Sequence, residues 1–410
     1  MVDISMPKTK RRMPGLAPSY DPREDSFLLE RWVKRLARGR VLDLGTGSGI
    51  QAIAAAELKE VKEVIGVDVQ KITIGYCKKN IKNPKIAFLA SDLFLEFTKG
   101  KNKEGTFDTI IFNAPYLPSD RKFPDPALDG GKHGYETIER FLKEANDCLE
   151  NEGIILLLFS SLTKKEKVDG FVKENLLESV LLEEQGHSFE RLFAYKISKS
   201  PLLKELCGAG LKGIAYFSKG KRGLVYKALY KGKKVAIKIQ NPKSAAIGKI
   251  EHEAAILLRL NKKRIGPNLL LHTEKYLVME FIEGVSLEEF VKKAPKKKAI
   301  NALLDVLDQM KTLDDLGITK EEMAHPQKHI IIAKKPVLID FERAHFALKP
   351  SNLTQFCQYL TSTNLSELLR GKNINIDKEK LIDLAKAYKN SAQKERQAAF
   401  KSIKIRLLSS

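Results

Sequence analysis

The chain has 410 residues, 43% hydrophobic and 30% charged, a composition typical of globular proteins and unlike that of disordered or fibrous ones. A chain of this length exceeds one ordinary hydrophobic core, so we expect two domains. No apolar run is long enough to cross a membrane, and no apolar segment follows the basic stretch at residues 8–12, so we expect no secretory signal and a cytoplasmic location.

The formal charge of +21 is unevenly distributed along the chain. Residues 1–197 carry 31 Lys and Arg against 30 Asp and Glu, whereas residues 198–410 carry 41 against 21. This asymmetry predicts two domains of different character, divided between residues 197 and 198. A positive field favours nucleic acid or another polyanion, but lysine runs without interleaved aromatic residues are equally typical of a solvated surface. Contact of the second domain with RNA or the ribosome is therefore a prediction from charge alone.

The cysteines are scattered through the chain and form no Cys-x-x-Cys pair. This spacing argues against both a disulfide framework and a zinc site, and it predicts thiols in the core. They are Cys77, Cys148, Cys207 and Cys357.

The first predicted elements are a short apolar strand at residues 41–44, a glycine-rich turn, and a helix with small residues on its packing face. Gly45 and Gly47 permit positive φ and let the backbone approach a ligand closely, while the helix N-terminus presents free N–H groups. Dinucleotide-binding enzymes use a similar turn, so the turn alone predicts only a nucleotide-type ligand.

Two further predicted strands end in a carboxylate. Residues 64–68 end in Asp68, and residues 86–92 end in Asp92. In doubly wound folds the first of these carboxylates can bind ribose hydroxyls, and the second is placed to accept a hydrogen bond from an adenine amino group. An aspartate after a strand is as often a helix N-cap or a turn former, so either aspartate alone leaves both interpretations open.

A fourth strand, predicted at residues 107–112, runs directly into Asn113, Ala114, Pro115 and Tyr116. Strands that alternate with helices form a parallel sheet, and the ligand crevice of such a sheet lies at the carboxyl ends of its strands. The glycine-rich turn, the two aspartates and this tetrapeptide are therefore expected to converge on one cofactor site.

These residues carry a family resemblance. Residues 43–49 together with Asp68 and Asp92 resemble the class I S-adenosylmethionine-dependent methyltransferases. Residues 113–116 resemble the Asn-Pro-Pro-Tyr signature of enzymes that methylate planar nitrogens. The match is closest to the HemK-like glutamine methyltransferases, in particular the archaeal and eukaryotic type that modifies a class I peptide chain release factor.

Two more segments support this narrower resemblance. Residues 20–26 resemble that group's Tyr-x-Pro-x-Glu-Asp-Thr/Ser stretch, and residues 130–134 resemble its Gly-Gly-x-x-Gly segment. The likeness runs from residue 20 to residue 197. The resemblance also implies a small zinc-binding activator subunit as a partner.

The resemblance implies a role for each matched residue. The glycine-rich turn would seat the methionine part of S-adenosyl-L-methionine, Asp68 the ribose and Asp92 the adenine, while Tyr20 and Ser26 would close over the cofactor. The implied cofactor-binding set is Tyr20, Ser26, Asp43, Gly45, Gly47, Asp68, Asp92 and Asn113.

The tetrapeptide is the implied catalytic set: Asn113, Ala114, Pro115 and Tyr116. The Asn113 side-chain oxygen and the Ala114 carbonyl would each accept a hydrogen bond from the substrate NH2, and Tyr116 would stack on the flat amide. Ala114 stands where proline is usual; it keeps the carbonyl and loses only the fixed φ of proline. An adenine amino group fits the same two acceptors, so N6-methylation of DNA or RNA is the alternative function, although it ordinarily needs a way to extract the base.

The second half begins with a pattern typical of protein kinases. Residues 218–225 match a Gly-x-Gly-x-x-Gly-x-Val loop when its valine is aligned with Val225. Ser218 takes the place of the first glycine, and Gly220 and Gly223 are the other two. The Val-Ala-Ile-Lys run that ends in Lys238 matches the strand lysine that binds phosphates.

The other kinase elements follow in order. Glu251 or Glu253 could pair with the lysine, and residues 277–282 resemble the hinge strand that receives adenine. Residues 340–342 resemble the metal-binding Asp-Phe-Gly, with Asp340 as the Mg²⁺ ligand and Glu in place of Gly. The set resembles an atypical, RIO-like protein kinase. The implied ATP-binding set is Gly220, Gly223, Lys238, Glu253 and Asp340.

The catalytic loop departs from this resemblance. Two registers place Met323 or Ala324 at the catalytic aspartate, and Lys328 or His329 at the asparagine that binds the second metal. Glu321 and Glu322 substitute only after a shift of register. Without a carboxylate that orients the hydroxyl nucleophile, phosphorylation should be slow, so a pseudokinase or RNA-binding module is an open alternative.

Together these patterns predict an α/β class I methyltransferase with a doubly wound, mostly parallel sheet at residues 1–197. An α+β protein-kinase-like domain with two lobes is predicted at residues 198–410. The expected function is S-adenosylmethionine-dependent methylation of a glutamine in a release factor, with ATP and Mg²⁺ binding in the second domain.

Overall fold

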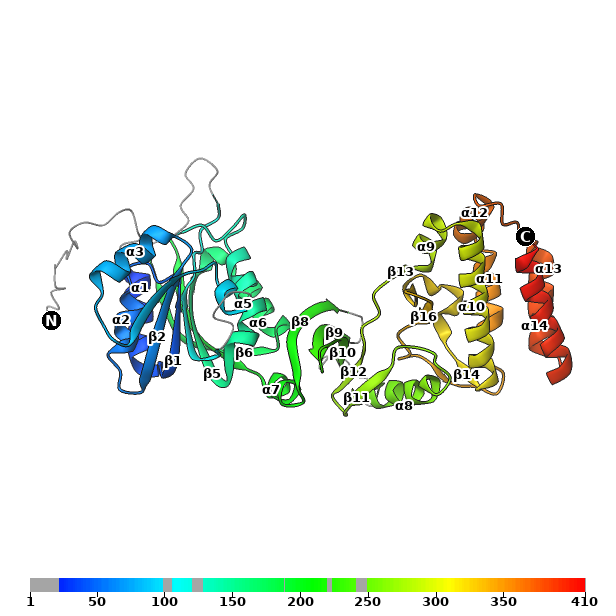
Figure 1. Ribbon diagram of the computed structural model, residues 1–410, viewed down its shortest axis with the longest axis horizontal. Helices are drawn as coiled ribbons and strands as arrows, with labels where there is room; N and C mark the ends of the chain where they lie inside the picture. Colours follow the sequence, from blue (N-terminus) through cyan, green and yellow to red (C-terminus); the bar gives the residue numbers. More distant parts are fainter. Residues whose placement is uncertain are drawn as a thin grey trace. The chain divides into compact units, whose positions relative to one another are not determined.

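A computed structural model describes residues 22–98, 105–119, 128–187, 189–219, 223–240 and 249–409 (Figure 1). The chain divides into two compact units, Met1–Tyr216 and Phe217–Ser410. The last strand of the first sheet ends at Lys199, and the expected boundary between residues 197 and 198 stays a prediction. None of the helices in the described ranges is both long and apolar enough to cross a membrane.

The first unit is built on a mixed sheet. Its strands are β1 Gly39–Leu44, β2 Val61–Asp68, β3 Ile86–Ala90, β4 Phe107–Asn113, β5 Leu149–Ser160, β6 Leu177–Gly186 and β7 Arg191–Lys199. The strand order across the sheet is β3-β2-β1-β4-β5-β7-β6. The first five strands in this order pair in parallel, and β7 runs antiparallel to both of its neighbours. The order reverses beside β1, so the carboxyl ends of β1 and β4 border the crevice in which doubly wound folds bind ligands.

Helices cover both faces of this sheet (Figure 1). They are α1 Glu24–Leu36, α2 Ile50–Ala56, α3 Lys71–Asn80, α4 Leu95–Thr98, α5 Glu136–Cys148, α6 Lys165–Glu174 and α7 Pro201–Gly208. On one face, α1, α2 and α3 pack in one apolar cluster with Val41 of β1, Val61 and Val64 of β2, and alternate residues 154, 156 and 158 of β5. On the other face, Phe141 of α5 packs against Phe94 and Phe112, with ring centroids 5.6 and 4.7 Å apart. The central strands β1, β4 and β5 are largely buried on both faces because helices cover both, whereas the edge strand β6 is mostly exposed.

The central strand β5 shows why the sheet forms where it does. The apolar run at residues 154–159 is the longest in the chain, and its side chains are buried as the sequence predicts. Burying one such side chain stabilises the fold by roughly 1.5–3 kcal/mol.

The next sheet along the chain is antiparallel, in the order β11-β12-β10-β9-β8, and its first strand, β8, begins before the division at residue 217. Its strands are β8 Leu211–Lys219, β9 Gly223–Tyr230, β10 Lys233–Gln240, β11 Leu269–His272 and β12 Tyr276–Glu280, and α8 Lys249–Asn261 lies between β10 and β11 in the chain. The alternation of buried and exposed residues along β9 is typical of a sheet with one solvated face.

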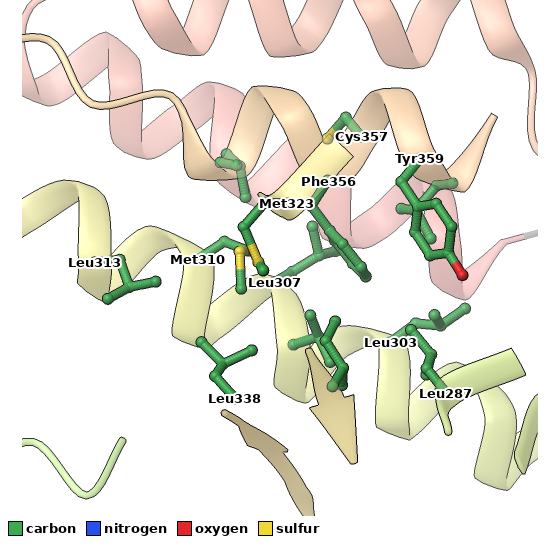
Figure 2. Packing of buried hydrophobic residues seen from close by; sticks show 14 of the residues in the cluster. Leu287, Leu303, Leu307, Met310, Leu313, Met323, Leu338, Phe356, Cys357 and Tyr359 are labelled. Atoms are coloured by element: carbon green, nitrogen blue, oxygen red, sulfur yellow. The ribbon is translucent and has the colours of Figure 1, made fainter. Parts of the chain in front are cut away.

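A helical region follows the sheet. Its helices are α9 Leu287–Lys293, α10 Lys296–Asp315, α11 Asn352–Leu360, α12 Thr363–Arg370, α13 Lys378–Asn390 and α14 Gln393–Leu408. Figure 2 shows Leu303, Leu307 and Met310 of α10 facing Phe356 and Tyr359 of α11 in the apolar core. The fold is thus a Rossmann-like methyltransferase sheet followed by the antiparallel sheet and helical region of a kinase fold.

Short strands within the helical region position the loops that matter for the second site. They are β13 Val285–Ser286, β14 Ile318–Thr319, β15 Ile330–Ile332, β16 Pro336–Leu338 and β17 His345–Phe346. β14 pairs antiparallel with β17, and β15 pairs with both β13 and β16. Between β14 and β15 the chain forms two short 3-10 turns, Glu321–Ala324 and Pro326–Lys328.

Candidate functional sites

The first unit has a cavity at the carboxyl ends of its parallel strands. It is bordered by the ends of β1, β2 and β4, by the start of α1, and by Arg140 of α5. Of the residues expected at the cofactor or catalytic site, the cavity is lined by Ser26, Gly45, Gly47, Asp68, Asp92, Asn113, Ala114, Pro115 and Tyr116. Tyr20 lies outside the described residues.

The glycine-rich turn requires its glycines. Gly45 and Gly47 both have positive φ, +62° and +51°, which L side chains rarely adopt. Asp43, which was expected to bind cofactor, is not among the described residues that line the cavity, and a direct role in cofactor binding stays a prediction. Its Oδ2 accepts hydrogen bonds from the Thr46 hydroxyl at 2.6 Å and the Ala52 N–H at 3.2 Å. Burial raises the pKa of Asp43 to about 7. Asp43 therefore holds the turn against the start of α2.

The two aspartates that follow β2 and β3 differ in environment. Asp68 is buried, which raises its pKa, and it accepts hydrogen bonds from the N–H groups of Gly47 and Gln70 at 3.2 and 2.9 Å. A carboxylate has about four lone-pair sites, so acceptor capacity toward the cavity remains. Asp92 has a half-exposed side chain and pairs with Arg140 at 2.7 Å.

Asn113 is oriented by a buried carboxylate from the start of α1. Its Nδ2 donates to Asp25 Oδ2 at 3.0 Å. A carboxylate only accepts hydrogen bonds, so the Asn113 amide must turn its NH2 toward Asp25 and its Oδ1 away from it. Among the described residues no donor reaches this buried Oδ1. A buried acceptor without a partner is costly, so this atom fits a ligand that brings an N–H or O–H.

The segment after Asn113 is held by the glycine segment at residues 130–134. The N–H of Gly130 donates to Leu117 O at 2.8 Å, and the Ala114 N–H donates to Leu158 O at 3.2 Å. A Cβ at Gly130 would lie 2.6 Å from Pro115 O, and one at Gly134 would lie 2.6 Å from Tyr116 O. The glycines permit this close backbone approach, and Tyr116 is buried beside the cavity.

The second unit has a cavity of about 990 Å³, within the roughly 300–1,000 Å³ of typical small-molecule sites. Its lining includes Gly223 and Val225 of β9, Ala236 of β10, and residues 279–284 at the end of β12 and directly after it. Gly220 lies outside the described residues. The described ends of the expected glycine loop, the strand that carries Lys238 and the hinge segment thus line one cavity.

Lys238 lies at the centre of a charged network in this cavity. Its Nζ is 2.7 Å from Glu253 Oε2, 2.8 Å from Asp340 Oδ1 and 3.2 Å from Glu342 Oε2. Burial alone would lower the pKa of Lys238, but the carboxylates of Glu253 and Asp340 raise it above its usual range. Burial would likewise raise the pKa of Asp340, but the charge of Lys238 lowers it. Of the two glutamates that the sequence left open, Glu253 makes the pair.

The carboxylates of Glu253, Asp340 and Glu342 offer oxygens within 4.8 Å of one another. Carboxylate oxygens are the donors that Mg²⁺ prefers, so the donor set fits that ion. Glu253 also accepts the N–H of Phe341 at 3.1 Å, which fixes the Asp340 segment against α8.

The loop between β14 and β15 completes the cavity. Glu322, Lys328 and His329 line it, whereas Met323 is fully buried in the apolar core. The fully buried Lys320 donates through Nζ to the Asp340 carbonyl and, at 3.1 Å, to Glu322 Oε2. Burial lowers the pKa of Lys320.

Comparison with known proteins finds two family models, each matching a different half of the chain. Residues 24–188 match the family model of the methyltransferase small domain. A relative from Methanocaldococcus jannaschii, provisionally named a protein N5-glutamine methyltransferase, is 39% identical over 158 residues, which cover 37% of this chain and 77% of the relative. The chain belongs to the protein N5-glutamine methyltransferases. Residues 213–393 match the model of the protein tyrosine and serine/threonine kinases, so the second unit is a protein kinase domain.

Other relatives of the methyltransferase unit are more distant. A release factor glutamine methyltransferase from Rhodopirellula baltica is 30% identical over 171 residues, 37% of this chain and 56% of the relative. A solved complex from E. cuniculi that methylates a translation termination factor is 24% identical, with a TM-score of 0.36, and covers 44% of this chain and 99% of that one.

Sequence reasoning missed two side chains of the methyltransferase site. Asp25 belongs to the stretch that supports the family resemblance, but its contact with Asn113, 88 positions away, has no signal in a single sequence. Arg140 is the second, and its pairing with Asp92 spans 48 positions. In the kinase domain the missed residues are Lys320 and Glu342, because neither matches a kinase motif.

Proposed function

We propose that the methyltransferase unit transfers a methyl group from S-adenosyl-L-methionine to the side-chain amide nitrogen of a glutamine in a class I peptide chain release factor. The observation that carries the proposal is the orientation of Asn113: Asp25 takes its NH2 group, and its Oδ1 is left as an acceptor beside the cavity. Membership of the N5-glutamine methyltransferases and the likeness to release factor methyltransferases support this substrate.

The residues of the cavity fit the methyl donor. The glycine-rich turn leaves room for a ligand close to the backbone, and Asp68 provides carboxylate oxygens for the ribose hydroxyls. Asp92 and Arg140 line the same cavity as an ion pair, and the Asp92 carboxylate would accept a hydrogen bond from the adenine amino group. Bound S-adenosyl-L-methionine supplies an electrophilic methyl group on a positively charged sulfur.

The protein must make a poor nucleophile reactive, because the lone pair of an amide nitrogen is delocalised into its carbonyl. Asn113 Oδ1 accepts a hydrogen bond from one N–H of the substrate amide and the Ala114 carbonyl accepts one from the other, which holds the nitrogen in line with the methyl group. Tyr116 packs on the flat face of the amide. A strong general base is unnecessary, since the nitrogen loses its proton only as the C–N bond forms.

The test compares substrates and one variant. The protein is incubated with labelled methyl donor and, separately, a release factor with Gly-Gly-Gln, the same factor with Gln→Glu, DNA, and RNA, each with and without a small zinc-binding partner. We expect label only in the Gly-Gly-Gln factor. Asn113→Ala should lower its rate by roughly 1,000-fold, the upper end for loss of one oriented polar group.

Asn151→Ala is the matched control, because Asn151 is exposed on β5. Label in adenine of DNA or RNA would favour the alternative function. Equal rates for the wild type and Asn113→Ala would remove the clamp from the mechanism.

We further propose that the kinase domain binds ATP and Mg²⁺ and is of the RIO-like type. Lys238 would bind the phosphates, residues 280–282 the adenine, and Asp340 the metal, as their positions around one cavity support. The excess of positive charge in residues 198–410 supports contact with RNA or the ribosome, measurable as salt-sensitive RNA binding.

A further inference from the structure

The cavity of the kinase domain contains a carboxylate that its sequence motifs do not identify. Glu322 lines the cavity together with Lys238 and Asp340, yet its side chain is only 13% exposed. We propose that Glu322 is the catalytic base of this domain, which transfers the terminal phosphoryl group of ATP to a hydroxyl group. The inference rests on the ATP binding proposed above and goes beyond it.

The strand pairing places Glu322 at the reaction site. In the ladder of β14 and β17, Ile318 lies opposite Phe346 and Thr319 opposite His345. The segment that follows β14 therefore lies beside the segment that precedes β17, which contains Asp340. Glu322 comes three residues after Thr319, so the topology brings the two carboxylates to one side of the cavity.

A buried lysine fixes this juxtaposition. Lys320 Nζ donates both to the Asp340 carbonyl and to Glu322 Oε2, and Lys320 is fully buried, so its ammonium cannot be solvated by water instead. Its own N–H donates to Asn352 Oδ1 at 2.7 Å, and Asn352 is held by the buried Asp314. On its other side, Glu322 Oε1 lies 3.9 Å from Arg343 Nε. Glu322 is thus held between two cations.

The other residues of the loop do not fit the role. Met323 lies in the apolar core and Ala324 has no polar group. Glu321 is absent from the described lining of the cavity and pairs instead with Arg343 at 2.6 Å, with 42% of its side chain exposed. Lys328 lines the cavity, but its ammonium suits the phosphates. Among these residues only Glu322 brings a carboxylate to the cavity.

In the proposed transfer, one phosphorus–oxygen bond forms as another breaks, and the hydroxyl proton moves to Glu322. The acceptor oxygen forms a bond to the γ-phosphorus of ATP while the bond from that phosphorus to the bridging oxygen of ADP breaks. The hydroxyl proton passes to a Glu322 carboxylate oxygen, and ADP leaves with its new terminal charge. Lys238 and Lys328 carry positive charge beside the phosphates, where negative charge accumulates.

The test separates ATP binding from phosphoryl transfer in the full-length protein. Binding of ATP with Mg²⁺ is measured by calorimetry, and transfer by label from γ-labelled ATP in protein and by phosphate release. We expect Glu322→Gln to bind ATP within about threefold of the wild type and to lose transfer by roughly 100-fold or more, as for general bases. Glu321→Gln is the matched control and should retain both. Glu322→Asp keeps a carboxylate and should recover part of the rate.

Each outcome bears on one claim. An absence of measurable ATP binding to the wild type would overturn the proposed function itself. ATP binding without any transfer in the wild type would overturn the inference alone, as would a Glu322→Gln rate equal to the wild-type rate. A rate that Glu322→Gln loses, Glu322→Asp partly recovers and Glu321→Gln retains supports it.

Discussion

The two sites depart from their family motifs in different ways, and the difference shows which atoms each chemistry uses. In the methyltransferase unit Ala114 replaces a proline, but the proposed acceptor there is a main-chain carbonyl, which every residue has. In the kinase domain a side-chain carboxylate is needed, and the motif registers place Met323 or Ala324 at that point. Glu322 brings a carboxylate to the cavity from one or two positions earlier.

The sites also differ in how their polar groups are held. Asn113 is a neutral group whose orientation is fixed before any ligand binds, because Asp25 can only accept a hydrogen bond. Lys238 instead lies among three carboxylates, which must share it with the phosphates of a nucleotide. We therefore expect substitutions in the first site to change rate, and those around Lys238 to change affinity.

The contrast is tested most strongly by Asp25→Asn. An asparagine at position 25 can donate as well as accept, so the Asn113 amide is free to flip and present its NH2 to the substrate. We expect the methylation rate to fall on the order of 100-fold, as for a misplaced reacting group. Affinity for S-adenosyl-L-methionine, measured by calorimetry, should change little.

Glu24→Gln is the control for this variant, because Glu24 is the adjacent acidic residue on α1 and is exposed. A loss of cofactor affinity as large as the loss of rate would show that Asp25 acts on the cofactor and not through Asn113.

Much of the methyltransferase unit could be predicted from the sequence because its signals are local. Each of the four predicted strands is an apolar run whose end carries the polar group, and a parallel sheet brings such ends together. Asp43 shows the limit of this reasoning: it lies inside the strongest motif, yet it bonds Thr46 and Ala52 behind the turn. Side chains alternate along a strand, and the motif alone does not say which face a residue takes.

The kinase loop could not be placed from the sequence because its position is set by distant pairing. Lys320 and Glu322 take their places from the β14 and β17 ladder and from the contact of Lys320 with Asn352, 32 positions away, which Asp314 holds in place. Motif alignment left two registers open, and it does not predict the two 3-10 turns that the chain forms between β14 and β15.

Asp43 gives a smaller test, of stability rather than rate. Burial raises its pKa in the folded protein to about 7, above the unfolded value, so folding favours its protonated form. The stability this provides is fully present below about pH 4 and is lost as the pH rises to 7, at 1.36 kcal/mol per pKa unit. Asp43→Asn removes this loss, so from pH 5 to 7 the wild type should lose about 2 kcal/mol relative to the variant.

Trp32 makes the measurement specific to the methyltransferase unit. It is the single tryptophan of the chain and packs beside the apolar cluster of α1, so its fluorescence reports unfolding of that unit alone. Glu60→Gln, which changes an exposed acidic residue of the same unit, is the control. A difference between wild type and Asp43→Asn that stays constant with pH would mean that Asp43 does not titrate in this range.

The smallest expected effect tests the affinity side of the contrast. Lys238→Met removes the charge shared among Glu253, Asp340 and Glu342, so the phosphates lose a cation and meet three carboxylates. We expect ATP affinity to fall about 10-fold, equivalent to about 1.4 kcal/mol.

Lys238→Arg keeps the charge and should retain most of the affinity. Lys234 lies on the same strand as Lys238, and Lys234→Met breaks only its exposed ion pair with Glu283. This variant should leave the ATP affinity unchanged. If Lys238→Met instead binds ATP as the wild type does, the three carboxylates hold the lysine too tightly for it to reach a nucleotide. The ion pairs of Lys238 would then stabilise only the fold of the domain. In that case Lys238 would not be shared with a nucleotide, and the contrast with the oriented Asn113 would not hold.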